Sequence, residues 1–227
     1  MGDIGRLAVF ATLLVVGAGV AGLQALAMAK RLGARVSAVD IRAEAREQAG
    51  SLGAEVMDPG VPPDLAEHTG GYARALSSDW LKREREALAP LLAKADLVVL
   101  SALVPGKVAP VLVTDEMISG MPPGSVVVDI AVDQGGNCDA TEPGRIVGRQ
   151  GVQIIGIANI PGRVPSTATS LYARNVLNFL DFLAPAGALD VNREDEILTG
   201  TLTTHDGRVV HAGALESWAA LDEGGAA

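Results

Sequence analysis

Short runs of apolar residues alternate with longer amphipathic or charged segments along most of the chain. The runs have the length and content of strands buried in a sheet, and they lie at 13–16, 35–39, 55–57, 97–100, 125–130, 146–147 and 152–157. Helical patterns separate several of them, at 23–31, 43–52 and 78–94. This alternation predicts an α/β fold with a doubly wound, parallel sheet and right-handed connections.

The last part of the chain has a different pattern. Residues 166–183 predict a long helix with a broad apolar face, formed by Leu171, Val176, Leu177, Leu180 and Leu183. Further on, Asp206-Gly207 stands between two β-prone runs within 199–211, which is a strong signal for a β-hairpin. Neither element belongs to the expected sheet, so we predict a C-terminal helix and β-hairpin appendage.

The first apolar run leads directly into Gly17, Gly19 and Gly22, the pattern G-x-G-x-x-G of a Rossmann-like dinucleotide fold. Gly17 permits the tight turn, Gly19 leaves room for a pyrophosphate, and Gly22 lets the next helix lie close to the strand. A helix beginning near Val20 points backbone N–H groups and the positive end of its dipole at the phosphates. A glycine-rich turn without a ligand is the alternative, because the chain has 27 glycines.

An acidic residue ends the second apolar run. Asp40 lies 18 residues after Gly22, and an acid about 20 residues beyond the glycines binds the adenosine ribose hydroxyls in this kind of fold. A carboxylate accepts a hydrogen bond from a free 2′-hydroxyl and repels a 2′-phosphate. Asp40 therefore favours NAD(H) over NADP(H), although Arg42 keeps the second choice open.

A long loop is predicted at 58–71, where three prolines and three glycines interrupt the pattern. Loops of this length in compact domains are usually functional or mobile. The loop ends in Gly70, Gly71 and Tyr72, and an exposed tyrosine without a function is the alternative interpretation. The turns at 101–106 and 133–137 follow two further strands, at the sheet edge where ligands bind.

Composition excludes several classes of protein. The 227 residues carry a net charge of −9, which argues against nucleic acid or an anionic membrane surface as a partner. The single cysteine, Cys138, cannot form an internal disulfide, so a reducing cytoplasm fits and a metal cluster does not. Residues 7–29 are uncharged, but their three glycines and strand-like first half argue against a membrane span. We assign no catalytic or metal-binding residue.

Six blocks of sequence, in order, carry a resemblance to one family. They are GAGVAGLQALAMAKRLGARV from residue 17, VDIR from 39, GGYA from 70, ALVPGKVAPVLVTDEM from 102, PGSVVVDIAVDQGGNCDATEPG from 123 and NIPGRVPSTATSLYARNVLNFL from 159. Together they resemble the NAD(H)-binding domain of the alpha subunit of proton-translocating NAD(P) transhydrogenase. Alanine dehydrogenases share the glycine motif and parts of two later blocks, whereas GGYA and NCDATEPG look like transhydrogenase.

The resemblance implies a component that binds NAD(H) and passes hydride to or from NADP(H) on another component. The exchange is coupled to proton movement through a separate membrane subunit, so the expected partners are the NADP(H)-binding and membrane subunits. By position, the nucleotide contacts would be Val20, Asp40, Ile41, Arg42, Gly71 and Leu103. Tyr72 would be the tyrosine of a mobile loop that closes over the nucleotide. The family has a further nucleotide contact from a glutamine, and this chain departs from it with Glu84 at that position.

The resemblance also implies a domain organisation. We expect a short leader at 1–11, an NAD(H)-binding domain at 12–163, the helix and hairpin at 164–215 and a tail at 216–227. Family members carry a further domain before the glycine motif, on which this helix and hairpin pack. We therefore expect a truncated or split subunit, cytoplasmic or peripheral at the inner face of the plasma membrane, that forms a homodimer.

Three functions remain open at this point. The first is the NAD(H)-binding part of a transhydrogenase, and the second is an enzyme like alanine dehydrogenase. The third is a nucleotide-binding fragment without catalysis of its own. The second would need a substrate-binding lysine and histidine, which in the family lie before the glycine motif.

Overall fold

The structure, a computed structural model, describes residues 11–67, 72–185, 187–189, 191–192, 194–215 and 218. The chain divides into two units, Met1–Ile160 and Pro161–Ala227, which we describe separately. The predicted boundaries between leader, domain, appendage and tail stay predictions.

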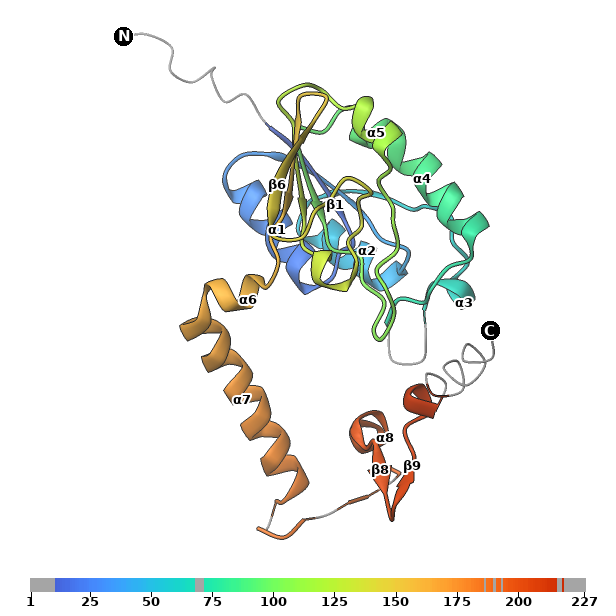
Figure 1. Cartoon of the computed structure of the whole chain (residues 1–227), viewed down its shortest axis with the longest axis vertical. Coiled ribbons are helices and arrows are strands. Elements are labelled where there is room, and N and C mark those ends of the chain that lie inside the picture. Colours follow the sequence, from blue (N-terminus) through green and yellow to red (C-terminus); the bar gives the residue numbers. More distant parts are fainter. Residues whose placement is uncertain are drawn as a thin grey trace. The chain divides into compact units, whose positions relative to one another are not determined.

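The first unit is built on one sheet, which has seven strands in the described part of the chain (Figure 1). In spatial order these are β3 Glu55–Met57, β2 Arg35–Val39, β1 Thr12–Val16, β4 Leu97–Leu100, β5 Val126–Asp129, β7 Val152–Gly156 and β6 Arg145–Arg149. All neighbours from β3 to β7 pair in parallel. The strand order reverses between β1 and β4, which makes the carboxyl ends of these two strands the expected ligand-binding edge.

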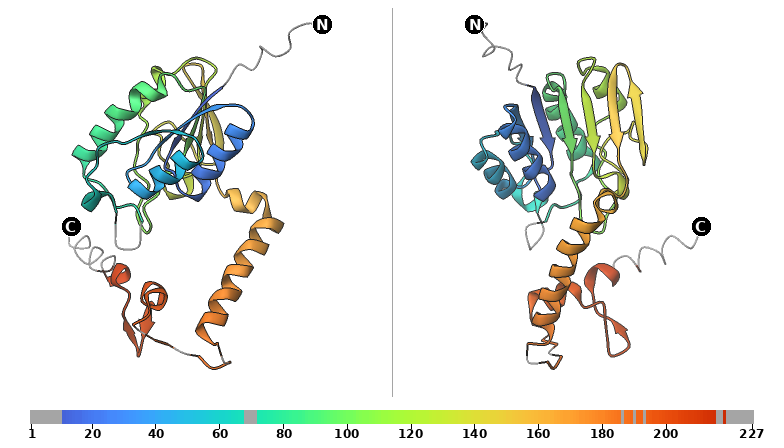
Figure 2. Two further views of the ribbon diagram at one scale, coloured as in Figure 1. Left: turned by 180° about the vertical axis from the view of Figure 1, so that it is seen from behind. Right: turned by 90° about the vertical axis from the view of Figure 1, so that its left-hand side faces the viewer.

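Helices cover both faces of this sheet (Figure 2). They are α1 Val20–Arg31, α2 Ala43–Ser51, α3 Pro63–Ala66, α4 Ser78–Leu92 and α5 Asp115–Ser119, with a short 3-10 helix, η2, at Val132–Gln134. The predicted α/β class is confirmed. The predicted strands and helices of this unit agree with the structure to within a few residues, and α3 lies inside the segment predicted as a loop.

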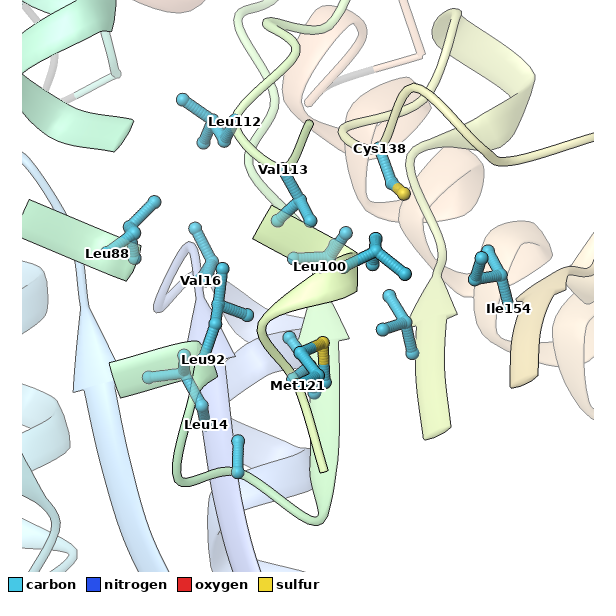
Figure 3. Close-up of a cluster of buried hydrophobic side chains, with 14 of the residues drawn as sticks. Leu14, Val16, Leu88, Leu92, Leu100, Leu112, Val113, Met121, Cys138 and Ile154 are labelled. Carbon is cyan, nitrogen blue, oxygen red and sulfur yellow. The ribbon is translucent and has the colours of Figure 1, made fainter. Parts of the chain in front are cut away.

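Alternate residues of β1 enter two different hydrophobic cores. Leu13 and Val15 pack with Leu26 of α1 on one face of the sheet. Leu14 and Val16 pack on the other face with a cluster that includes Leu88 of α4, as Figure 3 shows. Because successive side chains of a strand point to opposite faces, the continuous apolar run at 13–16 reflects burial on both sides.

One strand runs in a direction that we did not predict. We expected 146–147 to continue a parallel series, but β6 pairs with β7 in an antiparallel hairpin, with Arg149 opposite Val152. Only Gln150 and Gly151 connect the two strands, and their φ angles are +50° and +85°. Two residues with positive φ form the tight turn of an antiparallel hairpin, whereas a parallel pair needs a long crossover.

The second unit contains the predicted long helix and hairpin. Its elements are α7 Pro165–Leu183, α8 Glu196–Thr201, β8 Thr204–His205 and β9 Arg208–Val209, and α6 Ile160–Arg163 spans the division between the units. Asp206 and Gly207 form the turn, with φ of +49° and +72°. The hairpin is shorter than expected because Asp195 caps a helix over its first residues, accepting from the N–H groups of Ile197 and Leu198.

No residue of α7 is buried among those that the structure describes. Its exposed apolar side chains include Leu171, Tyr172, Val176, Leu177 and Leu180. Of the helices that the structure describes, none combines the length and apolar content needed to cross a lipid bilayer.

Candidate functional site

The glycine turn between β1 and α1 is packed against the loop that follows β4. Gly17 has a φ of +92°, and a Cβ placed on it would lie 2.6 Å from the backbone nitrogen of Ala102. The Ser101 hydroxyl donates a hydrogen bond of 2.6 Å to the Gly17 carbonyl oxygen. Gly17 in turn donates its N–H to the Val39 carbonyl oxygen at 2.9 Å. The turn therefore joins the carboxyl ends of β1, β2 and β4.

The other two glycines of the motif differ in their surroundings. A Cβ on Gly22 would collide with the Gly17 carbonyl oxygen and lie 2.9 Å from Val15 Cγ1, so α1 lies directly against the turn. A Cβ on Gly19 would meet no described atom within 4 Å. Gly19 therefore leaves open space at the amino end of a twelve-residue helix, while Gly22 allows close packing. The packing at Gly22 agrees with its predicted role, and the pyrophosphate contact at Gly19 stays a prediction.

Asp40 lies at the carboxyl end of β2 and is 6 % exposed. Its Oδ2 accepts from the Ala18 N–H at 2.8 Å, which ties the carboxylate to the glycine turn. Its Oδ1 accepts from the Arg42 N–H at 2.8 Å. The Arg42 guanidinium completes the set, with Nε 3.0 Å from Oδ1 and Nη2 2.9 Å from Oδ2. The hydrogen bond to Asp40 is the main cause of a raised pKa at Arg42.

Arg46 is a positioning residue that the sequence pattern did not single out. From α2, its Nη1 donates to the carbonyl oxygens of Asp40 and Ile41, at 2.9 and 2.7 Å. Its Nη2 forms an ion pair with Asp58 at 2.8 Å. Arg46 therefore fixes the backbone that carries Asp40 and the start of the segment after β3. The sequence offered one indication of this role: Arg46 is the basic residue of α2, four residues after Arg42.

Asn137 and Asp129 hold the loops after β4 and β5 together, and both are fully buried. The Asn137 amide accepts from the Ala102 N–H at 3.0 Å and donates to the carbonyl oxygens of Ala102 and Pro110, at 2.9 and 2.8 Å. Asp129 accepts from the Asn137 N–H at 2.8 Å. The sequence predicted a turn at 133–137, but these bonds link residues far apart in the chain. They fix Ala102, which packs against Gly17, at the start of the loop that carries Leu103.

Glu84 is a further acid near this edge of the sheet, on the buried side of α4. It is 5 % exposed. Burial is the main cause of a rise in the pKa of Glu84 to about 7, the negative charge of Asp40 adds to it, and Arg85 lowers it. A carboxyl with this pKa exchanges its proton near neutral pH.

The structure brings most of the predicted site residues to one edge of the sheet. Gly17, Gly19, Gly22, Asp40 and Arg42 surround the turn, and Ile41 is half-buried between the last two. Val20 and Leu103 are 84 % and 41 % exposed, so they offer apolar surface at this edge. Tyr72 is 62 % exposed, and no hydrogen bond joins it to the others within the described residues. Gly71 lies outside the described residues.

A shallow hollow of about 440 Å³ lies elsewhere, along β6, and is lined by Glu142, Arg145 and residues 146–149. It contains an exposed ion pair between Arg145 and Glu142. β6 is the outermost strand of the sheet, whereas ligands of open α/β sheets bind where the strand order reverses, here between β1 and β4. We therefore place the site at the glycine turn.

Known proteins resemble almost the whole chain. The family model described as "Alanine dehydrogenase/PNT, C-terminal domain" matches residues 4–212. An NAD(P) transhydrogenase alpha subunit of Rhodospirillum rubrum is 48 % identical over 206 residues, which cover 88 % of this chain and 53 % of that protein. Alanine dehydrogenase of Bacillus subtilis is 32 % identical over 202 residues, 87 % of this chain and 48 % of that enzyme.

A solved structure agrees with these matches. The transhydrogenase from Sinorhizobium meliloti superposes with a TM-score of 0.67 at 40 % identity, over 89 % of this chain and 50 % of that one. The chain thus spans about half the length of the relatives that it matches. With the family model matching residues 4–212, this chain belongs to the alanine dehydrogenase/PNT C-terminal domain family.

Proposed function

We propose that this chain is the NAD(H)-binding component of a proton-translocating transhydrogenase. In this function the bound dinucleotide exchanges hydride with NADP(H) held on another component. The observation that carries the proposal is the contact of the Asp40 carboxylate with the glycine turn, 2.8 Å from the Ala18 nitrogen. This contact supports the proposal because a buried carboxylate beside an open helix amino terminus suits a ribose and a pyrophosphate.

The amino end of α1 would hold the pyrophosphate. Gly19 precedes this helix without a side chain that donates or accepts a capping bond, and the first turn of α1 has no acidic residue. The first N–H groups of a helix have no partner within the helix and carry partial positive charge, so they suit a pyrophosphate. Val20 and Leu103 would contact the dinucleotide from either side of the turn.

Asp40 would bind the adenosine ribose, and this requires a movement of Arg42. Within the described residues four donors already reach the carboxylate, two at each oxygen. Two oxygens accept about four hydrogen bonds in total, so a ribose hydroxyl must replace one of these donors. The two backbone N–H groups are fixed by the fold, so the Arg42 guanidinium is the donor that would move away.

The choice of NAD(H) rather than NADP(H) follows from the same carboxylate. Asp40 is buried, so its charge acts on a neighbouring 2′-phosphate with little screening. Arg42 compensates part of that charge, which makes the preference a property of the pair rather than of Asp40 alone.

The relatives support transhydrogenase over alanine dehydrogenase, since identity is 48 % to the Rhodospirillum rubrum transhydrogenase subunit and 32 % to the Bacillus subtilis enzyme. We further propose that hydride transfer here involves other components of a transhydrogenase. These would be an NADP(H)-binding subunit and a membrane subunit, with this chain at the cytoplasmic face. Tyr72 and Gly71 would close over the dinucleotide.

Calorimetric titration with NADH and with NADPH tests the proposal. NADH should bind more tightly than NADPH, and Asp40→Asn should weaken NADH binding by about 1.5–3 kcal/mol, the range for hydrogen bonds to charged groups. Asp96→Asn is the matched control, because Asp96 also accepts a backbone N–H, from Thr12 at 2.7 Å, but precedes β4 at the opposite end of the strand from the glycine turn. Equal affinity for the two dinucleotides would contradict the assignment of NAD(H). Binding without hydride transfer, after addition of the partner subunits, would favour a non-catalytic fragment.

A further inference from the structure

One peptide group of the glycine turn is held by side chains from two different strands. Its carbonyl oxygen, on Gly17, accepts from the Ser101 hydroxyl at 2.6 Å. Its N–H group, on Ala18, donates to Oδ2 of Asp40 at 2.8 Å. The C=O and N–H groups of a trans peptide point in opposite directions, so Ser101 and Asp40 hold this peptide from opposite sides. A hydroxyl, a peptide and a carboxylate thus form one chain of hydrogen bonds.

The Ser101 hydroxyl is fixed at this position. Its oxygen is 3.5 Å from the Val16 carbonyl oxygen, so the Gly17 carbonyl oxygen at 2.6 Å is the acceptor of its single proton. A Cβ on Gly22 would lie 3.0 Å from the same hydroxyl oxygen, so the third glycine of the motif leaves the space that this oxygen occupies. The Ser101 N–H donates to the Val16 carbonyl oxygen at 2.8 Å, which holds the backbone that carries the hydroxyl.

The peptide after Gly17 depends on such a contact because glycine restricts its own backbone least. Gly17 has a φ of +92°, and a glycine backbone rotates more freely than that of any other residue. A donor at its carbonyl oxygen limits rotation of the peptide that carries the N–H bound to Asp40. Hydrogen bonds in a chain also polarise one another, so the bond from Ser101 strengthens the bond to Asp40. Ser101 thus acts on the carboxylate through the peptide between them.

We propose that Ser101 is a positioning residue for Asp40: through the peptide after Gly17, its hydroxyl holds the carboxylate in the orientation that binds the adenosine ribose. This inference rests on the proposed function. Ser101 thereby contributes to the preference for NADH over NADPH, because that preference depends on where the carboxylate oxygens lie relative to the 2′ position. The pyrophosphate is common to both dinucleotides, so general damage to the turn would weaken NADH and NADPH alike.

The experiment is calorimetric titration of Ser101 variants with NADH and with NADPH. Ser101→Ala removes the donor and should weaken NADH binding about threefold to tenfold, the equivalent of one neutral hydrogen bond, with a smaller effect on NADPH. The affinity for NADH relative to NADPH should therefore fall. Ser101→Thr keeps a hydroxyl and should restore the affinity and the preference of the unmodified chain.

Ser125→Ala is the matched control. The Ser125 hydroxyl also donates to a carbonyl oxygen, that of Ala95 at 2.9 Å, but it precedes β5, at the amino end of the strand. This variant loses a bond of the same kind away from the glycine turn. It should be less stable than the unmodified chain and should keep both the NADH affinity and the preference for NADH.

A double-mutant cycle with NADH alone separates positioning from general damage. Asp40→Ala removes the acceptor at the end of the hydrogen-bond chain. In that background Ser101→Ala should change NADH affinity by less than about twofold, because the group that Ser101 positions is gone. Independent effects would instead add, and the loss from Ser101→Ala would be the same in both backgrounds.

Two failures are distinguishable. Equal weakening of NADH and NADPH by Ser101→Ala, or the same loss with and without the Asp40 carboxylate, overturns the role of Ser101 and leaves the dinucleotide site in place. No NADH binding by the unmodified chain overturns the proposed function and this inference with it. If Ser101→Ala folds poorly, Ser101→Cys takes its place, because a thiol is a weaker donor. Its preference for NADH should be lower than that of the unmodified chain, and an equal preference overturns the role of Ser101.

Discussion

The Arg42 guanidinium donates to both oxygens of the Asp40 carboxylate, Nε to Oδ1 at 3.0 Å and Nη2 to Oδ2 at 2.9 Å. The carboxylate that we expect to bind ribose is thus already satisfied in the unliganded chain. Arg42 stabilises this buried charge in the absence of a ligand. If a ribose binds to Asp40 as we propose, the Arg42 side chain must move.

Removing the guanidinium should change both stability and cofactor discrimination. Arg42→Gln leaves Asp40 with the N–H groups of Ala18 and residue 42. We expect a loss of about 3 kcal/mol in the free energy of unfolding, the lower end of the range for breaking a buried pair. The preference for NADH over NADPH should rise about tenfold or more, because a 2′-phosphate then meets an uncompensated carboxylate.

Denaturant unfolding and calorimetric titration of Arg42→Gln measure these two effects. Arg35→Gln, which removes a positive charge from an exposed position of β2, is the control and should change neither quantity noticeably. An unchanged NADH-to-NADPH ratio in Arg42→Gln would show that the pair does not govern discrimination.

Two glycines of the motif should respond in opposite ways to alanine. Gly22→Ala drives a Cβ into the Gly17 carbonyl oxygen and Val15, so we expect a loss of about 1–3 kcal/mol in the free energy of unfolding. Gly19→Ala meets open space, so stability should be retained while NADH affinity falls. Thermal unfolding and NADH titration of the two variants separate these effects. Full NADH affinity in Gly19→Ala would mean that the pyrophosphate lies elsewhere.

The stability of the first unit should decrease as the pH rises. The pKa of Glu84 is raised in the folded chain to about 7, above its value in the unfolded chain, so the folded state holds this proton more tightly. Stability from this group is complete below about pH 4 and is lost between about pH 4 and pH 7. Glu84→Gln should therefore be more stable than the unmodified chain at pH 8, by about 1–3 kcal/mol. Urea unfolding at pH 5 and pH 8 tests this, and an equal difference at both values would contradict it.

The exposed apolar side of α7 should make the purified chain associate. Leu171, Val176, Leu177 and Leu180 are all more than a third exposed, and burying each completely contributes roughly 1.5–3 kcal/mol. Such a patch marks an interface or drives aggregation. We expect a dimer at micromolar concentration by sedimentation, and Leu177→Lys should dissociate it. Asn178→Lys, with the same charge on an exposed polar position, should leave it intact. A well-behaved monomer of the unmodified chain would refute the homodimer.

The local sequence by itself determined those features whose causes lie within a few residues. The run into Gly17 predicted β1, the turn and α1, because the strand pattern and the glycine backbone requirement are both local. Asp206-Gly207 predicted a tight hairpin turn for the same reason. The distance of Asp40 from the glycines in the sequence identified it as a candidate site residue, and the structure places its carboxylate in contact with the glycine turn.

Only the tertiary structure decided which distant groups became partners. In the sequence Glu84 is one more charge on a charged helix. The packing of α4 against the core buries its side chain, and this burial raises its pKa. Asn137 likewise donates to the carbonyl oxygens of Ala102 and Pro110, 35 and 27 residues earlier, because β4 and β5 are neighbours in the sheet. Hydrogen-bond partners and burial depend on packing between residues far apart in the chain, and a local sequence pattern does not show which of these residues come into contact.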